Sequence, residues 1–290
     1  MRIYVVTDSS ASFSHPQLVA QSPLVVVPCS LRIGTTVYRD NIDLSTHEAI
    51  DRMARSESPP TLIAPDVTDF VATYTRLATV ADAVLSIHPS RTFSKSYQNA
   101  LFAAQRMHGK IPVNVLDCGT IGMAQGMIVR ATLRAIERQI YQSVEELMTF
   151  IRAKLEHIYS AFYVESTDFL MRNGILSFSH ALLCKMNAMR PIVTIEDGRL
   201  KPTEKVRNRV QGMQWLVEFV SEFQNFEDVL IVQPRSYMTN ETRLLLDRLA
   251  LQFPDKFFRY AIYSSSVATL IGCDATGVIV MEPDSYTRLS

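Results

Sequence analysis

Residues 83–100 read AVLSIHPSRTFSKSYQNA, and this stretch decides the fold class. Its first part, Ala83–His88, is a short apolar run typical of a strand that is buried on both faces. A helix pattern begins near Ser96, and Ser94 and Lys95 lie in the polar segment before it. The free N–H groups at a helix N-terminus favour an anion, so this segment is a candidate anion site. Serine is also a preferred helix cap, so an ordinary polar turn is the alternative.

The same strand, loop and helix order recurs through the first half of the chain. Further apolar runs with strand length occupy residues 3–6, 24–27 and 113–116. Helix starts are indicated by the pairs Ser45/Glu48, Asp66/Asp69 and Ser143/Glu146. This alternation predicts an α/β domain over residues 1–158, with a parallel sheet and helices on both faces.

The second half has a different pattern. Asp197-Gly198 lies between two strand candidates, residues 191–195 and 199–202, and is a strong hairpin signal. Other strand candidates cover residues 161–165, 229–233, 258–263 and 278–281, and helices are predicted at 207–223 and 241–252. We therefore predict a C-terminal α/β domain over residues 159–290, with a mixed or antiparallel sheet.

Composition excludes several classes of protein. The chain has 290 residues, of which 47% are apolar, and its 29 basic and 29 acidic residues cancel. A nucleic-acid partner is not expected, because such proteins carry a clustered basic excess. The N-terminus lacks a secretory signal, and no apolar run suits stable membrane insertion. The four cysteines are scattered (Cys29, Cys118, Cys184 and Cys273), which predicts free thiols in a cytoplasmic protein.

Searches for catalytic motifs predict no cofactor, no metal site and no catalytic residue. The chain has no glycine-rich phosphate loop, no G-x-S-x-G turn and no pair of histidines with metal spacing. Asp8, which follows the first strand, lies where open α/β sheets bind ligands. The alternative is that Asp8 hydrogen-bonds its own loop. An enzyme on a small acid or phosphate that used Asp8, Ser94 and Lys95 would lack a base next to its nucleophile.

Short motifs along nearly the whole chain follow the order and spacing of one known family. In the first half, Val6–Ser9 reads V-T-D-S, and Tyr38–Asp43 matches the family's Y-R-D-G-I-D except at Asn41. Pro60–Pro65 with Asp69-Phe70 takes the place of P-T-T-S-Q-P and its D-F, and Ser90–Ala100 lies where the family has S-S-x-L-S-G-T-Y-Q-S-A. Asp117–Gly126 matches D-S-x-x-x-S-M-G-Q-G at Asp117, Met123, Gln125 and Gly126. Later landmarks are Phe169-Leu170 through Gly174, Arg190-Pro191-Ile192, Asp197-Gly198 and Glu204–Arg207. On these motifs together, the chain resembles the DegV family of fatty-acid-binding proteins.

The resemblance implies a non-catalytic carrier similar to the acyl-binding subunit of bacterial fatty-acid kinase. A long-chain fatty acid would be buried between two α/β domains. Its carboxylate would be held by the N-terminal domain, and its acyl tail would lie in a tunnel covered by the C-terminal domain. The family's carboxylate ligands are a threonine of P-T-T-S-Q-P and the serine of L-S-G-T, and this serine falls on Ser94.

The chain departs from the family pattern at several polar positions. Leu62 and Ile63 replace the binding threonine and its serine neighbour, so Thr61 is the nearby hydroxyl. Lys95 replaces a glycine, Ile175 replaces the arginine of G-G-R-I, and the H-x-G-P-G motif reads Leu270–Asp274 without its histidine. Because of these departures, two questions stay open: whether the carrier has a kinase-like protein partner, and whether the chain is instead a scaffold or regulator that has lost the ligand. The predicted ligand-binding residues are Ser94, Lys95, Thr61, Ser96 and Asp8.

Overall fold

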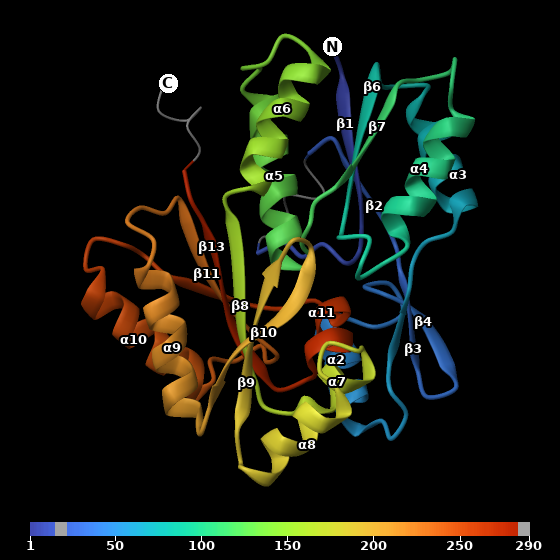
Figure 1. The fold of residues 1–290 in the computed structure, drawn as a ribbon. Helices are drawn as coiled ribbons and strands as arrows, with labels where there is room; N and C mark the ends of the chain where they lie inside the picture. Colours follow the sequence, from blue (N-terminus) through green and yellow to red (C-terminus); the bar gives the residue numbers. More distant parts are fainter. Residues whose placement is uncertain (15–21, 284–290) are drawn as a thin grey trace. The chain divides into compact units, whose positions relative to one another are not determined.

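The computed structural model describes residues 1–14 and 22–283, and the chain divides into two compact units (Figure 1). One unit takes Met1–Ser45 and Thr61–Glu156, and the other takes Thr46–Pro60 and His157–Ser290. Residues 46–60, which were predicted to belong to the first domain, therefore group with the second unit. The reason is that helix α2 (Thr46–Arg55) buries Ala49, Ile50 and Met53 and packs against α11 (Ser265–Ile271).

The first unit is built on a parallel sheet in the order β2-β1-β6-β7. Helices cover both faces of this sheet, α3 and α4 on one side and α5 and α6 on the other, which confirms the predicted architecture (Figure 1). The strands are apolar because both of their faces are buried. The elements are β1 (Ile3–Asp8), β2 (Leu24–Val27), β6 (Ala83–His88), β7 (Val113–Asp117), α3 (Val67–Leu77), α4 (Ser96–Arg106), α5 (Met123–Glu137) and α6 (Val144–Leu155).

Two of the predicted helix starts in this unit are confirmed as side-chain caps. Asp66 and Asp69 form a reciprocal capping box at the start of α3. Ser143 Oγ accepts a hydrogen bond from the backbone N–H of Glu146 at the start of α6, at 3.1 Å. These caps satisfy N–H groups that have no partner inside the helix, which explains why such residues mark helix starts in the sequence.

The same unit also contains a small antiparallel sheet that the sequence did not predict. Its order is β4-β3-β5, formed by β4 (Thr36–Arg39), β3 (Ser30–Ile33) and β5 (Thr61–Ile63). These strands are only three or four residues long, too short to show a clear hydrophobic period. β5 carries Thr61 and pairs it with Arg32 of β3.

The second unit has a six-stranded sheet in the order β10-β9-β8-β13-β11-β12. All neighbouring strands are antiparallel except β11 and β12, so the predicted mixed sheet is confirmed. Asp197 and Gly198 have φ values of 51° and 71°, as the predicted hairpin turn requires. The strands are β8 (Ile158–Val164), β9 (Arg190–Glu196), β10 (Arg199–Val206), β11 (Asp228–Gln233), β12 (Arg259–Ile262) and β13 (Ala275–Met281).

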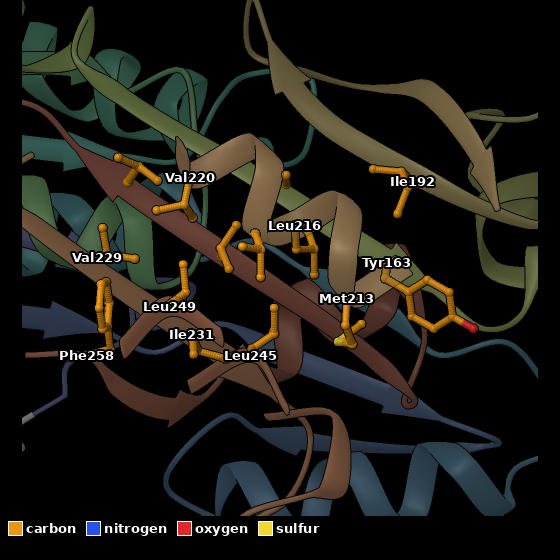
Figure 2. Close-up of a cluster of buried hydrophobic side chains, with 14 of the residues drawn as sticks. Tyr163, Ile192, Met213, Leu216, Val220, Val229, Ile231, Leu245, Leu249 and Phe258 are labelled. Carbon is orange, nitrogen blue, oxygen red and sulfur yellow. The ribbon is translucent and has the colours of Figure 1, made fainter. Parts of the chain in front are cut away.

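Helices α9 (Arg209–Ser221) and α10 (Asn240–Gln252) cover this sheet and confirm the two predicted helices, whereas the short helices α7 (Thr167–Arg172), α8 (Phe178–Met186) and α11 were not predicted. Figure 2 shows the core beneath α9, where Met213, Leu216 and Val220 meet Ile231 and Leu245.

No helix in the described part of the chain is long and apolar enough to span a membrane. All four cysteines are buried free thiols, as predicted.

Candidate functional site

The candidate site lies where the parallel sheet of the first unit changes winding direction. β2 pairs with one side of β1, and β6, which leads on to β7, pairs with the other side. In open α/β sheets, ligands bind beyond the carboxyl ends of the two strands at such a point. Here those ends are Asp8 of β1 and His88 of β6. The loop after β6 contains Ser94, and we call residues Ser90–Ser96 the serine loop.

Hydroxyl groups in the serine loop are paired with one another. Ser94 Oγ lies 2.9 Å from Ser96 Oγ and accepts the backbone N–H of Ser96 at 3.2 Å. Ser90 Oγ lies 3.1 Å from Thr92 Oγ1. Ser96 is fully buried and Ser94 is half-buried. The predicted anion-site residues Ser94 and Ser96 are thus brought together at the N-terminus of α4, a helix of 11 residues.

Lys95 lies between these two serines and has a different environment. It takes the N-cap position of α4, makes no side-chain cap hydrogen bond, and is exposed. Within the described ranges, its ammonium group has no ion-pair or hydrogen-bond partner. A positive charge at a helix N-terminus is unfavourable by about 0.3–1 kcal/mol, and a bound anion would remove this penalty.

Thr61 belongs to the same unit but has no hydrogen bond to the serine loop among the described residues. Its side chain is exposed on β5, and no hydrogen bond joins it to Ser94 or Ser96 in the described part of the chain. The loop after β5 is nevertheless attached to α4, because Asn99 Nδ2 donates to the carbonyl of Pro65 at 2.8 Å. Thr61 remains a predicted ligand residue on a neighbouring strand.

Asp8 is fully buried, and both of its carboxylate oxygens accept hydrogen bonds from the protein. Oδ1 accepts from the backbone N–H of Ser10 at 3.0 Å and from the Ser10 hydroxyl. Oδ2 lies 2.8 Å from His88 Nδ1. The loop hydrogen bond considered as the alternative for Asp8 is therefore present, and the side chain is satisfied without a ligand.

Residues that the sequence did not single out complete this buried network. His88 Nε2 lies 2.7 Å from Ser86 Oγ, which lies 2.7 Å from the hydroxyl of Tyr74 on α3. Gln125 Nε2 donates to Thr7 Oγ1 at 3.0 Å, and this hydroxyl donates to the carbonyl of Ile87. One signal was available in the sequence: Ser86 and His88 interrupt a run that is otherwise apolar.

Burial holds two titratable groups of this region, Cys29 and Tyr74, in their neutral forms. Burial, reinforced by the charges of Asp8 and Asp40, raises the pKa of Cys29 well above its ordinary value. Burial likewise raises the pKa of Tyr74. The thiol and the phenol are therefore neutral at physiological pH, and a neutral thiol is a poor nucleophile. In residues 1–14 and 22–283, no group of three or more His, Cys, Asp or Glu side chains could hold a metal ion.

Comparison with known proteins gives the family. The family model described as "Uncharacterised protein, DegV family" matches residues 2–283. The chain is 28% identical, over 97% of its length, to a DegV domain-containing protein of Caldanaerobacter subterraneus subsp. tengcongensis, 99% of which is covered. The chain therefore belongs to the DegV family.

Solved structures share the fold over almost the whole chain. A fatty-acid-binding DegV family protein from Thermus thermophilus has a TM-score of 0.85 and 24% identity, covering 98% of this chain and 100% of its own. The fatty acid kinase B3 protein of Streptococcus pneumoniae, which was solved loaded with linoleic acid, has a TM-score of 0.82 and 18% identity, with 98% and 100% covered. The two-domain α/β fold is thus that of DegV proteins.

Proposed function

We propose that this protein binds a long-chain fatty acid without converting it, and that the serine loop holds the carboxylate. The observation that carries the proposal is the pair of hydroxyls, Ser94 and Ser96, at the N-terminus of α4 beyond the strand end at the winding reversal. Hydroxyl and backbone N–H donors at a helix N-terminus match the needs of a carboxylate. The family and the ligands of its solved members support the same assignment.

Lys95 adds a positive charge to this site. A carboxylate within reach of its ammonium group would gain a charge-assisted hydrogen bond, worth about 1.5–3 kcal/mol. This gain would compensate for Leu62, which has no hydroxyl, and for Ile175, which has no charge. We assign Thr61 to the same ligand from β5, and Asp8 to an indirect role, because its oxygens are occupied by protein donors.

The acyl chain supplies most of the binding free energy. Each methylene removed from water contributes about 0.8 kcal/mol, so an apolar environment binds the tail without specific contacts. The carboxylate site then selects a fatty acid over a neutral lipid. We propose a non-catalytic role, which is supported by the neutral state of the Cys29 thiol beside Asp8. The buried free thiols support a cytoplasmic location, because thiols stay reduced there.

A protein partner is part of the proposal, and the similarity of the fold to the fatty acid kinase B3 protein supports it. We propose that this chain presents its fatty acid to a kinase-like protein that acts on the carboxylate. A second candidate, a regulator without ligand, is favoured by Leu62 and Ile175, which are apolar at positions where the family pattern is polar. Both candidates use the same fold and differ in whether the purified protein carries a lipid.

The proposal is tested by extracting the natively purified protein with organic solvent and identifying lipids by mass spectrometry. We expect a long-chain fatty acid in the wild type and less of it in Ser94→Ala. Ser143→Ala is the matched control, because it also removes a hydroxyl that accepts a helix N–H in the same unit, away from the serine loop. A wild-type protein that carries no lipid and takes up no fluorescent fatty acid would refute the carrier and favour the regulator.

A further inference from the structure

A chain of four buried side chains connects three elements below the serine loop. Tyr74 of α3 contacts Ser86 of β6, Ser86 contacts His88 of the same strand, and His88 contacts Asp8 of β1, with heavy-atom distances of 2.7, 2.7 and 2.8 Å. Each of these residues has 0% of its surface exposed. The ring of Phe70 packs edge-on against the imidazole, with centroids 4.9 Å apart.

Counting protons along this chain assigns the state of the imidazole. The Tyr74 hydroxyl has Ser86 Oγ as its hydrogen-bond partner among the described residues, so its proton points to Ser86. The Ser86 proton then points to His88 Nε2, which must be unprotonated to accept it. Nδ1 carries the ring proton and donates it to Asp8. Each donor among Tyr74, Ser86 and His88 then has an acceptor within this group of four side chains.

The opposite state leaves a polar group unsatisfied. If Nε2 were protonated, it would donate to Ser86, Ser86 would donate to Tyr74, and the Tyr74 proton would have no acceptor in the described part of the chain. Burial raises the pKa of Tyr74, so the phenol keeps that proton. A buried donor without a partner is destabilising, because it has lost its hydrogen bond to water and gained none in the protein. The hydrogen-bond pattern therefore favours a neutral imidazole with the proton on Nδ1.

The backbone of His88 leads directly into the serine loop. Its carbonyl accepts the N–H of Cys118 at 2.9 Å, and two residues later Ser90 N–H donates to the carbonyl of Thr120 at 2.9 Å. The carbonyl of Ser90 in turn accepts the N–H of Ser94 at 3.2 Å. The side chain of His88 attaches this strand end to β1, while its backbone attaches it to the loop after β7. His88 is therefore the point at which the end of β6 is joined both to β1 and to the loop after β7, two residues before the serine loop begins.

We propose that His88 is the positioning residue of the site: as a neutral imidazole held between Asp8 and Ser86, it fixes the strand end from which Ser94 and Ser96 are presented. This inference rests on the proposed function, because positioning is defined by its effect on carboxylate binding. The order Ser86, His88, Asp8 resembles a nucleophile, base and acid. A nucleophilic role is excluded by geometry, since Ser86 is fully buried and its oxygen is covered by Tyr74.

The test compares His88→Ala and His88→Asn with wild type, and His108→Ala serves as the control because His108 is exposed in the same unit. Binding of cis-parinaric acid, a fluorescent fatty acid, is measured beside binding of the corresponding alcohol. We expect His88→Ala to weaken acid binding at least tenfold and alcohol binding less than twofold. The asparagine variant should recover most of the affinity, because its amide N–H can take the place of Nδ1–H.

Three results would overturn the inference. Equal weakening of acid and alcohol would mean that His88 only stabilises the fold, and an unchanged affinity for the acid would remove any role in the site. A wild-type protein that binds neither the acid nor the alcohol would refute the proposed function itself. This outcome differs from the first two, in which the wild type binds the acid and only the role of His88 is refuted.

A spectroscopic measurement covers the case in which His88→Ala fails to fold. Long-range ¹H–¹⁵N correlation spectra of wild-type protein labelled at histidine distinguish Nδ1–H from Nε2–H. We expect the Nδ1–H form for the ring lost in His88→Asn, and a shift of its signals when fatty acid is added but not when the alcohol is added. The inference would be overturned by an imidazolium, by a ring protonated at Nε2, or by signals that do not shift when the fatty acid is added.

Discussion

Replacing Gly126 by alanine should destabilise the protein, although alanine is the better helix former. Gly126 lies in the first turns of α5, where the loop after β1 crosses the helix. A Cβ atom built on Gly126 would lie 1.7 Å from the carbonyl oxygen of Ser12 and 2.8 Å from its carbonyl carbon. Both atoms belong to the backbone, so rotating a side chain cannot relieve the clash.

Two opposing contributions decide the sign of the change. Alanine in a helix is more favourable than glycine by about 0.5–1 kcal/mol. Against this, Ser12 must retreat by about 1.7 Å to reach an ordinary contact of 3.4 Å. Overpacking of this kind costs about 1–3 kcal/mol. The movement also breaks the hydrogen bond from Ser12 N–H to the carbonyl of Gly122, worth about 0.5–1.5 kcal/mol. The net loss of stability is about 0.5–4 kcal/mol, with a central value of about 2 kcal/mol.

Urea denaturation followed by circular dichroism measures this difference. Thr149→Ala on the exposed side of α6 is the control, because it changes helix propensity without a new contact, and it should stay within about 0.5 kcal/mol of wild type. A Gly126→Ala protein that is as stable as wild type, or more stable, would refute the close approach of Ser12 to α5.

The other predictions concern the ligand, the buried chain and pH. Lys95→Met should weaken fatty-acid binding about tenfold, or about 1.4 kcal/mol, and leave the binding of a methyl ester unchanged. The control Lys110→Met, at an exposed lysine, should change neither affinity. Equal affinities of wild type and Lys95→Met for the acid would show that the Lys95 side chain points into solvent. Ser86→Ala should lower the free energy of unfolding by about 1–3 kcal/mol, and by more than Tyr74→Phe does, because it leaves both the Tyr74 hydroxyl and His88 Nε2 without a hydrogen-bond partner. Urea denaturation measures both variants, and the reverse order would contradict the proton assignment. Burial alone would raise the pKa of Glu165, but hydrogen bonds from Tyr163 and Arg190 and the charge of Arg209 lower it below its ordinary 4.5. The ionised Glu165 therefore contributes its full share to stability above pH 4.5, and this share declines as the pH falls through the lowered pKa. The difference in unfolding free energy between wild type and Glu165→Gln should shrink over that range. A difference that grew as the pH fell would contradict the pairing of Glu165 with Tyr163, Arg190 and Arg209.

Local patterns in the sequence were sufficient for much of the fold. The buried parallel strands are continuous apolar runs, because both faces of each strand are covered. Asp66 and Ser143 mark helix starts, because their side chains satisfy N–H groups only a few residues away. Asp197-Gly198 specifies a hairpin, because both residues accept a positive φ. Each of these features depends on neighbours in the chain, and the sequence displays those neighbours directly.

The resemblance to a family carried the candidate site further than the residues alone. It identified Ser94 by its motif and included Gly126 among the matching positions. The motif did not give the physical reason for Gly126, which is the contact with the backbone of Ser12 more than a hundred positions earlier in the chain. The strand and helix pattern, for its part, placed residues 46–60 in the first domain, whereas α2 packs on α11 and groups with the second unit.

Only the tertiary structure decided which polar groups meet beneath the site. Asp8 and His88 are 80 positions apart, and their contact exists because β1 and β6 pair side by side in the sheet. Tyr74 joins them from a helix that packs on one face of that sheet. In the sequence each of these side chains has an ordinary local explanation, as a loop residue, a lone histidine or a core aromatic. Their common role arises from burial, which removes water and obliges each donor to find its acceptor within the protein.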